Sequence, residues 1–161
     1  MAVQPDIFAK SRLMPGQLRA VAERRFADAQ CLLDSGNQER ANGAIYMAGF
    51  VVECLLKALL LQRHPNLQAR PNPSKLSTSD QYVLKLLYRH DLDEMVAMLP
   101  ELRKKLSGMK TESGQDLWST FTTICEEWTV YARYSPRNAK LERTSQYLDA
   151  VKEVKKWLKE L

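Results

Sequence analysis

The sequence predicts an all-α fold, an antiparallel up-and-down bundle of four long helices with one or two short helices inserted. Apolar residues recur at steps of three and four in several segments, which is the spacing of one buried helix face. No segment alternates apolar and polar residues as a strand does, and no internal repeat or glycine-rich phosphate loop occurs. A length of 161 residues, with 45% hydrophobic and 27% charged, is typical of one soluble domain covering 1–161.

The first helix is expected from Pro15 to Leu33. Its apolar residues form one stripe: Leu18, Ala22, Phe26, Ala29 and Leu33. Gly36 follows as a stop signal. Residues 1–14 are expected to be an N-terminal extension, since they show neither the basic start and apolar block nor the cleavage site of a signal peptide.

The second helix, Gly43 to Leu61, is apolar around nearly its whole circumference, which predicts the central helix of the bundle. Glu53 and Lys57 lie one turn apart with the acid on the N-terminal side, so they are expected to neutralise each other as a buried pair. The run also approaches the roughly 20 apolar residues of a membrane span. Its two central charges argue against that interpretation, and we expect no membrane insertion.

Residues 64–79 show no apolar period, so an irregular surface loop is expected there. Three prolines fall within it: Pro65, Pro71 and Pro73. Ser79 is expected to cap a short helix that runs through Tyr82 and Leu87.

The segment HDLDEMVAML predicts another helix start, with Asp91, Asp93 and Glu94 in the first turn as partners of the helix dipole. His90 opens this helix, and we expect it to be a cap or packing residue beside the central helix. Glu53, Lys57 and His90 are therefore assigned to a structural polar core.

A long amphipathic helix is expected from Gln115 to about Ala132. Its apolar stripe has an aromatic edge: Leu117, Phe121, Ile124, Trp128 and Tyr131. The segment RYSPRNAK interrupts the pattern. A last helix is expected to begin near Pro136, with another apolar stripe: Tyr147, Val151, Val154, Leu158 and Leu161.

Cys31, Cys54 and Cys125 are odd in number, far apart and on predicted helices, so neither a disulfide framework nor a metal site is expected. The two histidines, His64 and His90, have no finger-like spacing to a cysteine. The sequence therefore predicts a reducing, cytoplasmic location and neither a metal nor a cofactor.

The formal net charge of +5 permits an anionic partner, and four cations gather before the last helix: Arg133, Arg137, Lys140 and Arg143. Glu142 is the one acid among them. If the last helix begins near Pro136, Arg137 and Lys140 share its first turn, where free backbone N–H groups attract a phosphate.

The sequence also allows a structural interpretation of this segment, in which Arg133 only complements a helix C-terminus while Trp128 and Tyr134 are core residues. In the binding interpretation, Tyr134 or a neighbouring aromatic residue stacks on a base. The candidate binding residues are Arg133, Tyr134, Ser135, Arg137, Asn138 and Lys140.

Four segments, taken in order, resemble the HEPN (higher eukaryotes and prokaryotes nucleotide-binding) family: RFADAQCLLDSG, YMAGFVVECLLKALL, HDLDEM and W-x4-RYS. The resemblance covers about Arg24 to Trp157, and its most specific part is ECLLKA followed by His-Asp-Leu. It implies an up-and-down bundle that usually forms a homodimer and acts on RNA or binds nucleotides. It also implies a place in prokaryotic toxin–antitoxin or defence systems, often beside a nucleotidyltransferase.

Catalytic members of that family share a motif: an arginine, then a polar or aromatic residue and, after a gap of four to six residues, a histidine. In their dimer, two copies of the motif come together and cleave RNA without metal. Arg133 and Tyr134 match the start of this motif, but the histidine positions hold Asn138, Ala139 and Lys140. Asparagine exchanges no proton near neutral pH, and a lysine with its ordinary pKa of about 10.4 is a poor general base.

The sequence therefore favours a non-catalytic HEPN-like domain that binds a nucleotide or single-stranded RNA by phosphate neutralisation and base stacking. Two alternatives stay open. One is a metal-independent endoribonuclease toxin that would use Arg133, Asn138 and Lys140. The other is a dimeric scaffold that docks on a nucleotidyltransferase-family partner and binds no ligand.

Overall fold

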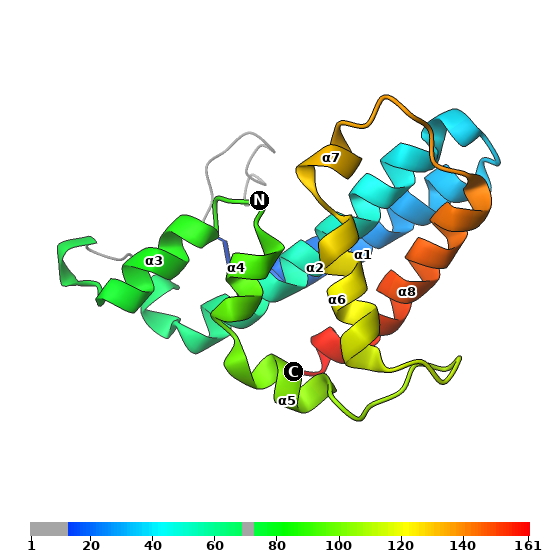
Figure 1. Cartoon of the computed structure of the whole chain (residues 1–161). Helices are drawn as coiled ribbons and strands as arrows, with labels where there is room; N and C mark the ends of the chain where they lie inside the picture. Colours follow the sequence, from blue (N-terminus) through cyan, green and yellow to red (C-terminus); the bar gives the residue numbers. More distant parts are fainter. Residues whose placement is uncertain (1–12, 69–72) are drawn as a thin grey trace, which may run out of the picture.

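A computed structural model describes residues 13–68 and 73–161 (Figure 1). The expected all-α fold is confirmed, because these two ranges hold eight α-helices and no strand. Most of the expected N-terminal extension and the middle of the expected 64–79 loop lie outside the described residues.

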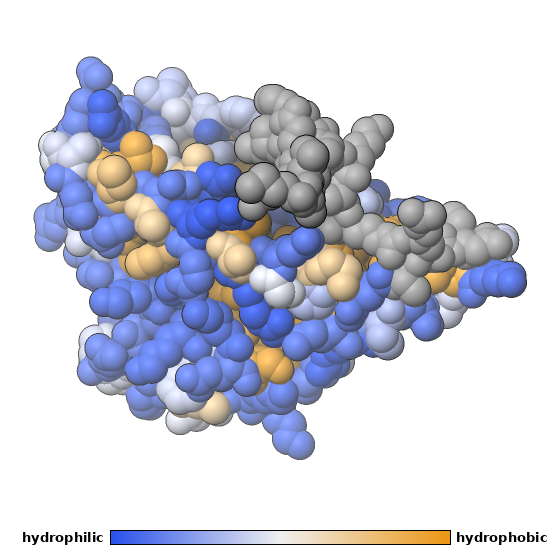
Figure 2. Space-filling view, turned by 180° about the vertical axis from the view of Figure 1, so that it is seen from behind, coloured by the Kyte–Doolittle hydropathy of each residue, from blue (hydrophilic) through white to orange (hydrophobic). Residues whose placement is uncertain are grey.

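Three long helices form the centre of the molecule: α1 (Pro15–Asp34), α2 (Ala41–Arg63) and α8 (Leu141–Lys159). α2 lies beside α1 along most of its length and also contacts α8 (Figure 1). Every residue of α2 from Val51 to Leu61 is buried, which confirms that this apolar run forms the central helix. The face in Figure 2 is mostly hydrophilic, with hydrophobic residues gathered in a few patches.

By length and composition, the stretch Gln38–Arg63 would be long enough to cross a membrane. Of its most apolar window, 78% is buried inside the protein. The core helix of a soluble protein can have the same length and composition, so these two properties do not distinguish the cases. That the helix does not enter a membrane stays a prediction.

Three short helices separate α2 from the rest of the chain: α3 (Thr78–Leu86), α4 (Leu92–Ala97) and α5 (Pro100–Leu106). The predicted cap of α3 is wrong, because the side chain of Ser77, and not of Ser79, accepts the N–H of Asp80 at 3.0 Å. Asp93 and Glu94 lie in the first turn of α4 as expected. Asp91 precedes that turn and is its N-cap, a role that the sequence allowed for His90. α5 was not predicted. The expected loop before α3 contains two short 3₁₀ turns, Pro65–Leu67 and Pro73–Lys75.

The long helix expected from Gln115 to Ala132 is in fact two helices, α6 (Leu117–Glu127) and α7 (Val130–Arg133). Trp128 leaves the helical conformation with ψ 62°, and the side chain of Thr129 caps α7 by accepting the N–H of Ala132 at 3.4 Å. The break lets the Trp128 ring pack against α2, where it is 3% exposed. The structure therefore has three long helices, and the expected fourth is a shorter helix with an added turn.

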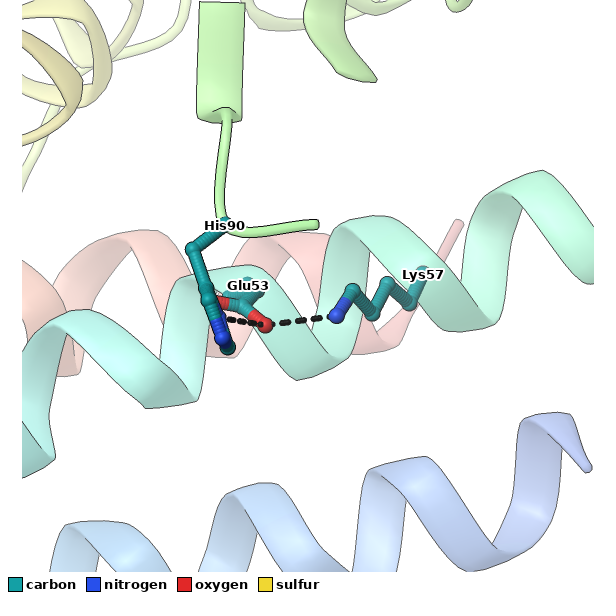
Figure 3. A network of polar contacts seen from close by, with 3 residues as sticks. All are labelled: Glu53, Lys57 and His90. Atoms are coloured by element: carbon teal, nitrogen blue, oxygen red, sulfur yellow. Dashed lines mark hydrogen bonds and ion pairs between the residues drawn. The ribbon is translucent and has the colours of Figure 1, made fainter. Parts of the chain in front are cut away.

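Glu53 and Lys57 form the expected buried pair, and His90 joins it from the start of α4, although the His90 side chain is 51% exposed (Figure 3). Lys57 Nζ donates to Glu53 Oε1 at 2.6 Å, and His90 Nδ1 lies 3.0 Å from both Glu53 oxygens. Because an ionised carboxylate only accepts hydrogen bonds, this geometry requires the proton on His90 Nδ1. The His90 ring also meets the Phe50 ring edge-on, with centroids 5.7 Å apart. The triad thus ties the start of α4 to the central helix.

All three cysteines are free in this structure. Burial raises the pKa of Cys54 to about 11 and that of Cys125 to about 12. Both thiols are therefore protonated and unreactive near neutral pH, whereas Cys31 is exposed.

Candidate functional site

A cavity of about 270 Å³ lies between the N-terminal end of α2 and the chain that follows α6. Its lining comes from two parts of the sequence: Asn42, Ile45 and Tyr46 on α2, and Trp128, Ala132, Arg133, Ser135, Arg137, Asn138 and Ala139. The volume is just below the roughly 300–1,000 Å³ of ordinary small-molecule pockets, so the cavity suits a ligand no larger than about one nucleotide.

Asn42 holds the far wall of this cavity in place. Its amide nitrogen donates to the carbonyl of Arg137 at 2.7 Å and to that of Ser135 at 3.5 Å, and its amide oxygen accepts the N–H of Ala139 at 2.8 Å. One side chain therefore satisfies three backbone groups in a segment that has no helical hydrogen bonds of its own. No sequence pattern singled out Asn42; the available signal was a polar residue in the first turn of a mostly apolar helix.

This clamp explains why the prediction for the start of the last helix is wrong. α8 begins at Leu141 rather than near Pro136, and Lys140 is its N-cap residue without a capping side chain. Arg137 lies before the helix, in the non-helical segment that crosses the N-terminal end of α2 (Figure 1). Arg137 and Lys140 thus do not share a helical first turn, and the phosphate site predicted there does not form.

The floor of the cavity is aromatic. The Trp128 ring lies 6.2 Å from the Tyr46 ring and 5.4 Å from the Phe50 ring, centroid to centroid. The indole fits because position 49 is glycine: a Cβ on Gly49 would lie 2.0 Å from the indole ring. Gly49 and Tyr46 are a second contribution of α2 that sequence patterns did not reveal.

Arg133 closes the cavity on one side. Its guanidinium carbon lies 4.9 Å from the centroid of the Trp128 ring, a cation–π contact, and its buried Nε has no hydrogen-bond partner. Within the described ranges, Arg133, Arg137 and Lys140 make no ion pair. Arg143, by contrast, pairs with Glu127. Two guanidinium groups without an acidic partner therefore line one cavity.

The predicted binding residues divide into two groups. Arg133, Ser135, Arg137 and Asn138 line the cavity, whereas Tyr134 and Lys140 do not. The structural interpretation of this segment is correct for two residues, because Trp128 is a core residue and Arg133 ends α7. It is wrong for Tyr134, which is 80% exposed.

A second cavity, of about 460 Å³, lies on the other side of Trp128 and Arg133. Its lining includes His90 together with Arg89, Asp91 and Asp93, so charges of both signs surround this histidine. The first cavity, in contrast, has no histidine, carboxylate or lysine in its lining. The first cavity can therefore hold an anion. It offers no general acid or base for neutral pH, because its arginines stay protonated.

Comparisons with protein-family models, with curated proteins and with solved structures find no match to this chain. The resemblance to the HEPN family therefore stays an expectation. Among the described residues, no group of three or more His, Cys, Asp or Glu side chains is placed to hold a metal ion.

Proposed function

We propose that this chain is a HEPN-like domain that binds a nucleotide or single-stranded RNA in the cavity between α2 and the segment from Trp128 to Ala139. One observation carries the proposal: Arg133 and Arg137, neither of which has an acidic partner, line an aromatic-floored cavity whose lining contains no acid. Guanidinium groups bind phosphate through charge-assisted, often paired hydrogen bonds, so this arrangement suits a phosphate-bearing ligand.

In this mechanism the phosphate neutralises the two guanidinium groups, while the base lies against the apolar side of the cavity formed by Ile45, Tyr46 and Trp128. The Asn138 amide offers donors and an acceptor to the polar edge of the base. Asn42 is already occupied by the backbone, so its part is to position the wall.

Binding without cleavage is the favoured form of this function. Of the three residues that an endoribonuclease would use, Lys140 does not line the cavity, and Asn138 cannot act as a base. The wider role, in a toxin–antitoxin or defence system as a homodimer or beside a nucleotidyltransferase-family partner, rests on the resemblance alone.

The test is a binding titration with a labelled single-stranded oligonucleotide and with free nucleotide. Arg133→Gln and Arg137→Gln should each lower affinity about tenfold or more, because a hydrogen bond to a charged group contributes about 1.5–3 kcal/mol. Arg103→Gln, which removes the same charge from an exposed position on α5, should have little effect. Wild-type affinity should also fall as salt rises.

An affinity that is unchanged in both site variants, or that falls equally in the Arg103 control, contradicts the proposal. The same preparations incubated with RNA in EDTA test the enzymatic alternative. Cleavage that disappears in Arg133→Gln would establish the endoribonuclease in place of the binding domain.

A further inference from the structure

The two most exposed aromatic side chains of the described residues, Tyr131 and Tyr134, lie on and directly after the short helix α7. Of the five large hydrophobic residues that the described ranges leave exposed, three lie between Val130 and Tyr134. Tyr131 is 85% exposed and Tyr134 is 80% exposed, and α7 lies at the periphery of the molecule (Figure 1). Exposed apolar groups that cluster in this way mark a contact surface.

The cationic and the aromatic side chains at α7 point in different directions. Arg133 lies over the buried Trp128 ring, whereas Tyr131 and Tyr134 are open to solvent. The Tyr134 N–H donates to the Val130 carbonyl at 3.1 Å, so the helical turn extends to Tyr134. Residues three apart on a helix lie on one face with Cβ atoms about 5–6 Å apart, so Tyr131 and the C-cap residue Tyr134 lie on the same side of this turn; we call this pair the tyrosine platform.

Charge indicates what covers this platform. No acidic residue occurs in the sequence between Trp128 and Leu141. Three cations in that stretch, Arg133, Arg137 and Lys140, have no ion-pair partner in the described part of the chain. Proteins bind single-stranded nucleic acid with aromatic side chains surrounded by unpaired cations. A neutral protein partner would contact the tyrosines but would leave these cations without a counter-charge.

We infer that the ligand is a single strand of three or more nucleotides rather than a free nucleotide, an inference that rests on the proposed function. One nucleotide occupies the cavity beside Arg133 and Arg137, and the bases of its neighbours stack on Tyr131 and Tyr134. The faces of bases in a duplex are already stacked on one another, so the strand must be unpaired to reach the platform.

Calorimetric titration with uridine monophosphate and with uridine oligonucleotides of two, three and six residues tests this inference. Wild-type affinity should rise with length up to three residues or more. Replacing both tyrosines, Tyr131→Ala with Tyr134→Ala, should abolish this rise, with a loss on the order of tenfold per stack, and leave monophosphate affinity unchanged. Tyr131→Phe with Tyr134→Phe should retain the affinity, because phenylalanine stacks equally well.

Tyr88→Ala is the matched control, since Tyr88 is 74% exposed and outside this platform. A thymidine hexanucleotide separates RNA from DNA ligands, because only RNA offers the 2′-hydroxyl. If the monophosphate binds and longer strands bind no more tightly, the inference is overturned but the proposed function stands. If neither ligand binds, both are overturned. If the double Ala variant keeps the wild-type oligonucleotide affinity but loses self-association in sedimentation, the platform contacts protein and the inference is wrong.

Discussion

At the scale of single residues, the site depends on one glycine. Gly49 lets the Trp128 indole lie directly on α2, and the indole in turn supports the Arg133 guanidinium 4.9 Å above its ring. A glycine within a helix costs roughly 0.5–1 kcal/mol relative to alanine, so a helix this apolar loses stability by keeping it. The close approach of the tryptophan explains why glycine is needed there.

Gly49→Ala should therefore destabilise the protein by about 1–3 kcal/mol, because the new Cβ overpacks against a rigid ring and this outweighs the gain in helix propensity. It should also weaken nucleotide binding, since Trp128 and Arg133 move together. Gly43→Ala is the control on the same helix: its Cβ would meet only the flexible end of Leu32 at 3.4 Å. That variant should be neutral or up to about 1 kcal/mol more stable. Chemical denaturation measures both, and equal effects of the two variants would contradict this account.

At the scale of elements, the segment between α7 and α8 owes its path to Asn42. From Pro136 to Ala139 its backbone makes no helical or strand hydrogen bond, and Asn42 supplies three contacts to residues 135–139 from the start of α2. Removing the amide leaves those backbone groups to water and frees the segment, while the buried core does not change.

Asn42→Ala should therefore increase the rate of trypsin cleavage after Arg133, Arg137 or Lys140, because a protease needs a locally released chain. Asn37→Ala, which removes the cap of the η1 turn (Gln38–Arg40), is the control and should leave those cleavage rates unchanged. Mass spectrometry of the early fragments identifies the cut sites. If both variants are cut as slowly as the wild type in this segment, Asn42 is not the clamp.

These elements also show how far the sequence predicts the fold. The apolar periods of α1, α2 and α8 are local, so they can be read from the chain, and the Glu53–Lys57 pair follows from helical spacing alone. The break at Trp128 depends on Gly49, and the path of residues 134–140 depends on Asn42. Both partners lie far away in the sequence, and no local pattern reports such contacts. α5 has seven residues, which is too short for a clear period.

At the scale of the whole molecule, the core is built around α2, with buried thiols on two different helices. Cys54 lies on α2 and Cys125 on α6, and both are buried, whereas Cys31 on α1 is exposed. The thiols therefore report whether the whole bundle is closed in solution.

One thiol, that of Cys31, should react rapidly with a disulfide reagent in the native protein at pH 8, and three should react in denaturant. Raising the pH to about 9 should not recruit the other two, because their pKa values of about 11 and about 12 keep them protonated. A Cys31→Ser variant should show no rapid phase. A second fast thiol in the native wild type would show that the core is open.

Ligand binding in the cavity floored by Trp128 can be followed by nuclear magnetic resonance. The indole N–H signals of the three tryptophans are recorded while a uridine trinucleotide is added. Trp128→Phe assigns the signal of Trp128, and Trp118 and Trp157 serve as internal controls outside the cavity lining. We expect the Trp128 signal to shift in proportion to bound ligand while the other two signals stay in place. Saturable binding that leaves the Trp128 signal unmoved, or that shifts Trp118 or Trp157 instead, would contradict it.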